Sequence, residues 1–281
     1  MREINVVRGI DDVRAATERL LQAADALDDD AVTAPSLLPG WTVGHVLTHV
    51  CRNADGNRRM LDGAMRREVL DQYPGGREGR AADIEAGASR SAALVRDDLR
   101  LSSVALAETI TQMTPDAWDR PVRPLGGEAP AWRTLLSRRR EVEVHHVDLG
   151  LAYRPTDWPS DFVVNELVAA GQRLSERLPP GTVLRLKATD TEQHLEARGR
   201  PAGEQGRPAE EGGRPAREGP VQTGEGPGGP GDGSSAAALV SHPIIVSGLG
   251  SWLLAWLVGR RVPTAALDAP AGLPALGAWS G

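Results

Sequence analysis

Apolar residues recur at helical spacing through most of residues 11–149, and this pattern constrains the fold more than any other feature of the chain. It predicts an amphipathic helix over residues 11–28 and a second helix that begins after Thr42 and runs to about residue 65. A third, long helix is expected over residues 81–113 and a fourth over residues 131–149. Four long helices with short connections predict an up-down bundle, and the core of such a bundle commonly holds a metal or cofactor.

A second, smaller domain is expected after a short linker. The linker contains Pro155 and Pro159, so we predict domains over residues 1–157 and 158–281. The expected elements of the second domain are, in chain order, a helix over residues 161–177, strands over 183–188 and 192–197, an extended piece over 244–246 and a short helix over 252–258. The fold class is therefore a helical bundle followed by a small α/β domain.

A long insertion of low complexity interrupts this second domain. Residues 199–235 contain 12 Gly and 6 Pro, and the sequence Gly-Arg-Pro-Ala occurs three times with a period of seven. Such a segment buries too little apolar surface to offset the entropy lost on ordering. We therefore expect a disordered Gly/Pro-rich insertion between strands.

Composition excludes several classes of protein. The net charge of −6 gives no basic surface for nucleic acid, and a single cysteine, Cys51, excludes both an internal disulfide framework and a cysteine-rich zinc site. Residues 234–259 carry no Asp, Glu, Lys or Arg, but His242-Pro243 breaks this stretch, so no transmembrane helix is expected. The polar N-terminus lacks an apolar signal region, which predicts a cytoplasmic location.

Two pairs of residues suggest a metal site. Glu141 and His145 lie four apart on the fourth predicted helix, and His45 and His49 lie four apart on the second. Imidazole nitrogen and carboxylate oxygen suit zinc first, and non-haem iron or another divalent ion second. A surface ion pair within the Glu141–His145 pair is the alternative.

Four residues adjacent to these pairs are not expected to be metal ligands. We expect Glu143 and His146 on other faces of the helix, either solvated or supporting the ligands from behind. Asp148 is expected to accept a hydrogen bond near the site or to have a purely structural role. Cys51 is expected to be a small buried side chain.

These residues carry a resemblance to a known family. The segments Leu38-Pro39-Gly40-Trp41-Thr42-Val43-Gly44-His45-Val46-Leu47-Thr48-His49-Val50 and Arg140-Glu141 to Gly150 resemble the mycothiol-dependent maleylpyruvate isomerase family. A third match, Ile245-Val246-Ser247-Gly248 followed by Trp256-Leu257-Val258-Gly259-Arg260, resembles that family's C-terminal domain. The resemblance implies a DinB-like four-helix metal-binding domain followed by a small α/β domain.

The resemblance also assigns roles to residues. It implies that His49, Glu141 and His145 bind zinc or another divalent metal, that His45 is not a ligand, and that Arg260 binds an anionic group of the substrate or cofactor. The implied cofactor is mycothiol, a low-molecular-weight thiol, whose thiolate adds to the cis double bond of maleylpyruvate and leaves after rotation. The implied partners are this thiol and a small-molecule substrate, with no nucleic acid and no membrane.

Two other functions stay open at this point. A mycothiol S-transferase would use the same thiolate on an electrophile, in detoxification or secondary metabolism, and would keep the thioether. A metal-binding regulator without enzymatic activity would show no dependence on a thiol.

Overall fold

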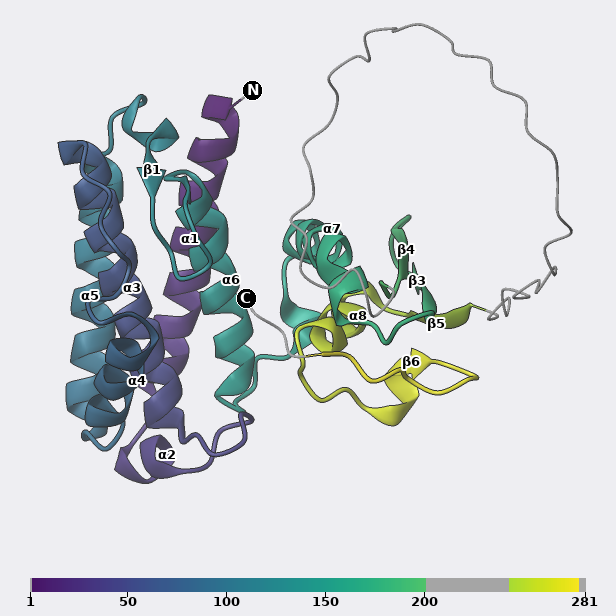
Figure 1. Cartoon of the computed structure of the whole chain (residues 1–281). Coiled ribbons are helices and arrows are strands. Elements are labelled where there is room, and N and C mark those ends of the chain that lie inside the picture. The colour runs from purple at the N-terminus through teal and green to yellow at the C-terminus, as the bar shows by residue number, and fades with distance from the viewer. Residues whose placement is uncertain (1, 201–242, 278–281) are drawn as a thin grey trace, which may run out of the picture. The chain divides into compact units, whose positions relative to one another are not determined.

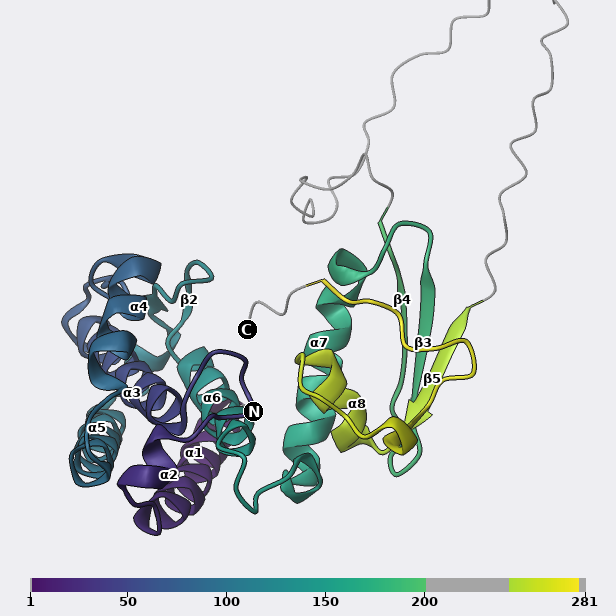
Figure 2. The same ribbon diagram turned by 90° about the horizontal axis from the view of Figure 1, so that it is seen from below.

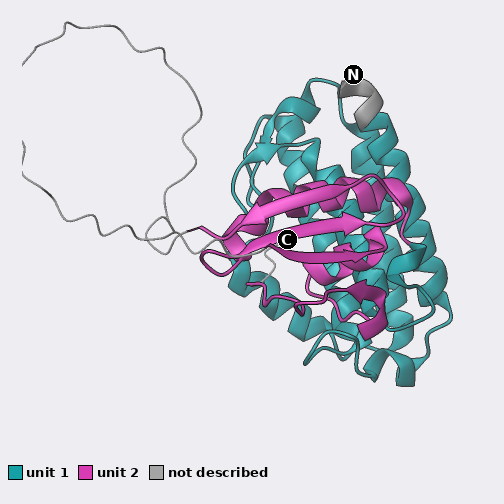
Figure 3. Cartoon of the chain, turned by 90° about the vertical axis from the view of Figure 1, so that its right-hand side faces the viewer, with its two compact units in different colours: residues 1–157 teal, residues 158–281 magenta. Residues whose placement is uncertain are grey.

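The computed structural model describes residues 2–200 and 243–277, and the chain divides into two compact units, Met1–Asp157 and Trp158–Gly281 (Figure 3). Each unit is described here by itself. The first is helical and the second combines helices with a small sheet, which confirms the expected fold class.

Four long helices make up most of the first unit. They are α1 (Arg2–Asp25), α3 (Val43–Arg66), α5 (Ala92–Gln112) and α6 (Arg133–Asp148) (Figures 1 and 2). Each helix packs against two others, in the closed order α1, α5, α3, α6. Their buried side chains are mainly Leu, Val and Ala, as expected for a chain with few aromatic residues. This packing places α3 directly beside α6.

The start of α3 is fixed by a reciprocal cap. The Thr42 side chain accepts a hydrogen bond from the backbone N–H of His45, and the Nδ1 of His45 accepts one from the backbone N–H of Thr42. The two bonds satisfy donors that the first turn of a helix leaves unpaired. Thr42 is therefore the N-cap that the sequence predicts, and the cap fixes where His49 lies along the helix.

The third predicted helix is wrong as a single element, because the chain turns between α4 (Gly76–Gly87) and α5. The turn packs tightly on α3. A Cβ atom on Gly44 would lie 2.3 Å from the carbonyl oxygen of Ala88, and one on Gly87 would lie 2.5 Å from the Thr48 Cγ2. The side chain of Ser91 then caps α5 by accepting from the Leu94 N–H. These close contacts with a distant helix cannot be recognised from the local pattern.

The smaller elements of the first unit connect these helices. Helix α1 begins well before the predicted residue 11, and its early residues Val6 and Ile10 continue the apolar spacing onto the core. The connecting elements are α2 (Asp29–Thr33), η1 (Ala117–Asp119), the paired short strands β1 (Pro121–Val122) and β2 (Ala129–Pro130), and η2 (Pro155–Asp157).

The second unit is a mixed four-stranded sheet covered by two helices. Its elements are α7 (Ser160–Arg177), β3 (Val183–Ala188), β4 (His194–Arg198), β5 (Ile244–Gly248), α8 (Gly250–Leu257), η3 (Thr264–Ala266) and β6 (Leu267–Asp268). The strand order is β4-β3-β5-β6, with β3 and β5 parallel and the outer pairs antiparallel. Both helices lie on one face of the sheet, and the buried Leu184 and Leu186 alternate with the exposed Arg185 and Lys187 (Figure 2).

Two further expectations concern the region after β4. The Gly/Pro-rich insertion over residues 199–235 lies, apart from its first two residues, outside the described part of the chain. No helix among the described residues is long and apolar enough to cross a membrane. The short helix predicted over residues 252–258 is α8 (Gly250–Leu257).

Candidate metal centre

Three side chains from α3 and α6 converge on one point inside the first unit. The Nε2 atom of His49 lies 2.7 Å from Glu141 Oε2 and 3.0 Å from His145 Nε2. The third side of this triangle, from His145 Nε2 to Glu141 Oε2, measures 3.5 Å. We call His49, Glu141 and His145 the ligand cluster.

The geometry of the cluster fits a divalent metal ion. In a tetrahedral zinc site with bonds of about 2.1 Å, neighbouring ligand atoms lie about 3.4 Å apart. The longest of the three distances equals that value within 0.1 Å and the other two are shorter, and each residue offers one suitable ligand atom. Two histidines and one carboxylate also leave a fourth coordination position open, as in catalytic rather than structural zinc sites.

The two histidines have opposite kinds of partner at their second ring nitrogen. Nδ1 of His145 lies 2.8 Å from Oδ2 of Asp148, a fully buried carboxylate. Nδ1 of His49 lies 2.9 Å from an Nη2 of Arg80, on α4. A metal-binding histidine usually has a carboxylate or carbonyl beside its other ring nitrogen, and of these two histidines only His145 does.

Burial and proximity shift the protonation of all three side chains. Burial, together with the nearby His145, lowers the pKa of His49 to about 4. Burial alone would raise the pKa of Glu141, but hydrogen bonds with His145 and His49 hold it well below its usual range. Burial alone would also lower the pKa of His145, but Asp148 and Glu141 raise it. At neutral pH the cluster therefore holds an ionised carboxylate and a neutral His49, which can both donate electron pairs to a metal.

The other histidine of α3 and the single cysteine lie outside the cluster. His45 forms the cap of α3, and its Nε2 lies 3.3 Å from Glu85 on α4. Cys51 is fully buried, and burial raises the pKa of its thiol to about 12. A thiol nucleophile for this site must therefore come from outside the chain.

A second buried polar group lies on another face of α6. Glu143 is 1% exposed, accepts a hydrogen bond from Arg19 at 2.5 Å and accepts another from the hydroxyl of Tyr153 at 2.6 Å. The Tyr153 ring stacks on the buried His146, with ring centroids 4.0 Å apart. The expectation of solvated side chains here is wrong, because the segment after α6 folds back and covers them. The group anchors this segment to the bundle.

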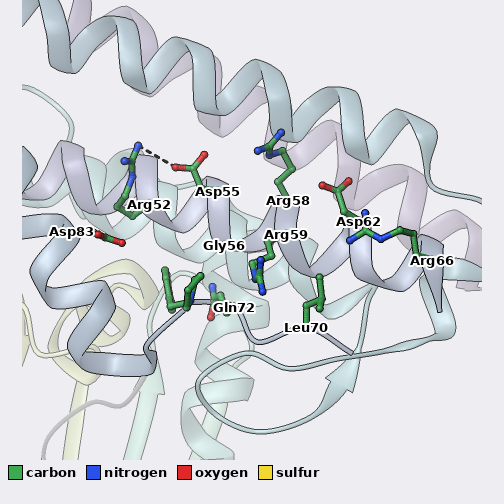
Figure 4. A pocket seen from close by; sticks show the side chains of 12 residues that line it. Arg52, Asp55, Gly56, Arg58, Arg59, Asp62, Arg66, Leu70, Gln72 and Asp83 are labelled. Carbon is green, nitrogen blue, oxygen red and sulfur yellow. Dashed lines mark ion pairs between the residues drawn. The ribbon is translucent and has the colours of Figure 1, made fainter. Parts of the chain in front are cut away.

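A hollow of about 400 Å³ runs along α3 beyond the cluster (Figure 4). Its wall is strongly charged, with four arginines and three aspartates; they are Arg52, Arg58, Arg59, Arg66, Asp55, Asp62 and Asp83. Tyr73 also lines it and lies under the guanidinium of Arg80 at 5.8 Å. Arg80 thus connects the edge of this hollow to the ligand cluster.

Comparison with known proteins finds a family model that matches most of the first unit. A family model described as the mycothiol maleylpyruvate isomerase N-terminal domain matches residues 13–150. Residues 13–150, all within the first unit, thus resemble the N-terminal domain of this family. The match contains the whole ligand cluster and two of the three segments that carry the resemblance in the sequence.

Solved structures of the mycothiol-dependent maleylpyruvate isomerase and of a point mutant of it share the fold. Each matches with a TM-score of 0.77 and 20% identity, over 98% of this chain and 97% of the other. At this identity the likeness establishes a shared fold over both units. A search of curated proteins finds no match.

The last predicted site residue, Arg260, lies in the second unit. It follows α8 and is half-buried, and its Nη1 donates to the carbonyl of Val258 at 2.6 Å. Its role toward an anionic group stays a prediction.

Sequence reasoning missed two residues of the site, Arg80 and Tyr73. Both lie in or next to α4, whose start the periodicity does not reveal, and neither belongs to a recognisable motif. The chain contains 31 arginines, so composition gives no reason to select Arg80 from among them.

The buried His146 predicts how the stability of the protein depends on pH. Burial, followed by the charge of Arg19, lowers its pKa to about 4, whereas an unfolded chain protonates histidine near pH 6.5. Between these values the unfolded state binds more protons, so the free energy of unfolding falls as the pH decreases from about 6.5 to about 4. In His146→Phe, which keeps an aromatic ring against Tyr153, this free energy should fall by about 1 kcal/mol less per pH unit.

Thermal unfolding at pH 7, 6 and 5 measures this difference. His194→Phe, at an exposed position of β4, is the matched control and should keep the wild-type dependence. An equally steep loss of stability in His146→Phe and wild type would contradict the interpretation.

Proposed function

We propose that the protein is a zinc-dependent, mycothiol-using enzyme that isomerises maleylpyruvate or a related cis-unsaturated acid. The observation that carries this proposal is the convergence of His49, Glu141 and His145 within a domain of this family. The choice of mycothiol as the thiol and of maleylpyruvate as the substrate rests on the names of the solved structures with the same fold. A cytoplasmic location stays a prediction of the sequence.

The three cluster residues would hold the metal, and neighbouring groups keep them ready for it. A divalent metal bound there supplies a Lewis acid that favours the thiolate form of a coordinated thiol. Glu141 stays ionised because both histidines stabilise its charge. Asp148 fixes the ring of His145 so that Nε2 faces the cluster. The edge of the Trp41 ring lies against His49 and limits the positions of that imidazole.

Arg260 would bind a carboxylate of the substrate or cofactor. A guanidinium presents two parallel donors to a carboxylate, which suits a substrate that carries two acid groups. The support for this role is the sequence resemblance of the segment around α8 and the shared fold of the second unit.

Removal of a ligand tests the metal site. Because His145 and Glu141 each supply one of three ligand atoms, His145→Ala and Glu141→Ala should lose nearly all bound zinc in elemental analysis of the purified protein. His45→Ala is the matched control, since His45 caps the same helix without reaching the cluster, and it should keep most of the metal. Wild-type zinc content in His145→Ala would place the ligands elsewhere, and a large loss in His45→Ala would indicate a four-ligand structural site.

Incubation of the zinc-loaded protein with mycothiol and maleylpyruvate tests the reaction. Addition followed by elimination returns the thiol, so fumarylpyruvate should form while the mycothiol concentration stays constant. Product analysis by chromatography and a thiol assay measure both quantities. A stable thioether that accumulates as thiol disappears would instead identify an S-transferase, and turnover without mycothiol would contradict the proposal.

Variants of Arg260 test the contribution of the second unit. Arg260→Ala should lower kcat/KM for maleylpyruvate by about 100-fold, because a charged two-point contact is lost, while zinc content stays at the wild-type level. Arg260→Lys should have a kcat/KM nearly as low as that of Arg260→Ala, since an ammonium lacks the planar pair of donors. The neighbouring Arg261→Ala is the control. Unchanged kinetics in Arg260→Ala would remove Arg260 from the site.

A further inference from the structure

The hollow along α3 has a fixed floor, formed by the loop between α3 and α4 (Figure 4). The loop approaches α3 closely at Gly56, where a Cβ atom would lie 2.8 Å from Cγ of Gln72. The backbone N–H of Gln72 donates to the carbonyl of Arg123 at 3.0 Å, and Nε of Arg59 donates to the carbonyl of Asp71 at 3.1 Å. These contacts hold the loop in place, so the floor of the hollow is preformed.

The side chain of Gln72 brings an unused hydrogen-bonding group to this floor. It lines the hollow and is only 8% exposed. Within residues 2–200 and 243–277, its amide forms no hydrogen bond. Buried polar groups in proteins are nearly always paired, because an unpaired one has lost its bonds to water. An amide offers one acceptor oxygen and two N–H donors, so a ligand in the hollow that both donates and accepts would satisfy it.

The walls of the hollow add one unpaired charge of each sign. Arg58 on α3 and Asp83 on α4 both line it, and neither forms an ion pair in the part of the chain that the structure describes. A strongly anionic molecule would meet three aspartates here, and a polycation would meet four arginines. The hollow therefore favours a neutral molecule that needs donors and acceptors close together.

Hydroxyl groups have this need, because each one donates and accepts. The hollow also presents apolar surface, from the ring of Tyr73 and the side chain of Leu70, and such surface suits the C–H face of a sugar or cyclitol ring. Its volume of about 400 Å³ falls within the range of about 300–1,000 Å³ found for small-molecule sites. Size, polarity and charge thus agree on one class of ligand.

We propose that the hollow along α3 binds a neutral polyhydroxylated molecule, a sugar or a cyclitol, through Gln72, Arg58 and Asp83. Its source is either a free molecule of this class or the thiol cofactor, since mycothiol bears a sugar ring and an inositol ring. The second source agrees with the position of the hollow: the Tyr73 ring lies 5.8 Å from the guanidinium of Arg80, which contacts His49 of the ligand cluster at 2.9 Å. Only this second source rests on the proposed function.

Calorimetric titration of the full-length protein with myo-inositol, glucose and mycothiol tests the site. Gln72→Leu and Arg58→Met each remove a polar contact, so each should bind the ligand about tenfold more weakly than wild type. Because Arg58 is exposed, its variant tests the hollow even where the buried Gln72→Leu disturbs the loop. Gln22→Leu, at an exposed position of α1, is the matched control and should keep the wild-type affinity.

Three results would overturn the proposal. The first is that wild type binds none of the three probes. The second is that every probe it binds has equal affinity for wild type, Gln72→Leu and Arg58→Met, which would place binding elsewhere. The third is tighter binding of glucose 6-phosphate than of glucose, because the hollow would then select an anion.

The probe whose binding weakens in the two variants identifies the source. Weaker binding of mycothiol assigns the hollow to the rings of the cofactor, whereas weaker binding of myo-inositol or glucose alone assigns it to a free sugar or cyclitol. None of these titrations requires turnover. A protein that shows the effects on myo-inositol or glucose and does not isomerise maleylpyruvate would retain this site and lose the proposed function.

Discussion

A buried arginine joins the two helices that carry the ligand cluster. Arg138 on α6 is 1% exposed, and its Nη1 donates to the backbone carbonyl of Val50 at 2.8 Å and to Asn53 Oδ1 at 2.9 Å, both on α3. Burial lowers the pKa of this guanidinium, and nearby groups that include Glu141 oppose the shift. A charge in such a place is costly unless its partners stay in position, so any slip of α6 along α3 would be strongly unfavourable. Because Glu141 follows one turn later on α6, the same contact fixes its height relative to His49.

The two histidines of the cluster have different neighbours at their second ring nitrogen. The carboxylate of Asp148 lies beside Nδ1 of His145, whereas the guanidinium of Arg80 lies beside Nδ1 of His49. The second ring nitrogens of the two histidines therefore face groups of opposite charge. On another face of α6, the buried carboxylate of Glu143 accepts hydrogen bonds from both Arg19 and Tyr153, which joins the bundle to the segment after α6.

The outline of the fold could be predicted because it follows from local spacing, whereas spacing left His45 and His49 both open as ligands and the family resemblance selected His49. Glu141 and His145 lie four apart on one helix, and Thr42 marks the start of the helix that carries His49. The break between α4 and α5 could not be predicted, since it depends on the absence of a Cβ at Gly44 and Gly87 where the turn meets α3. Sequence spacing likewise placed Glu143 and His146 off the ligand face but could not show that Tyr153 would cover them.

The sequence by itself determined which residues could share a helix face and which chemistry they could perform, because a helix repeats every 3.6 residues and ligand preference belongs to the side chain. Only the tertiary structure decided which second-layer groups face those residues. Arg80 and His49 are 31 positions apart, and Arg138 and Val50 are 88 apart, so their contacts depend on how helices pack. Helix packing is set by the fit of many small apolar contacts across the whole core, and no short stretch of sequence contains that information.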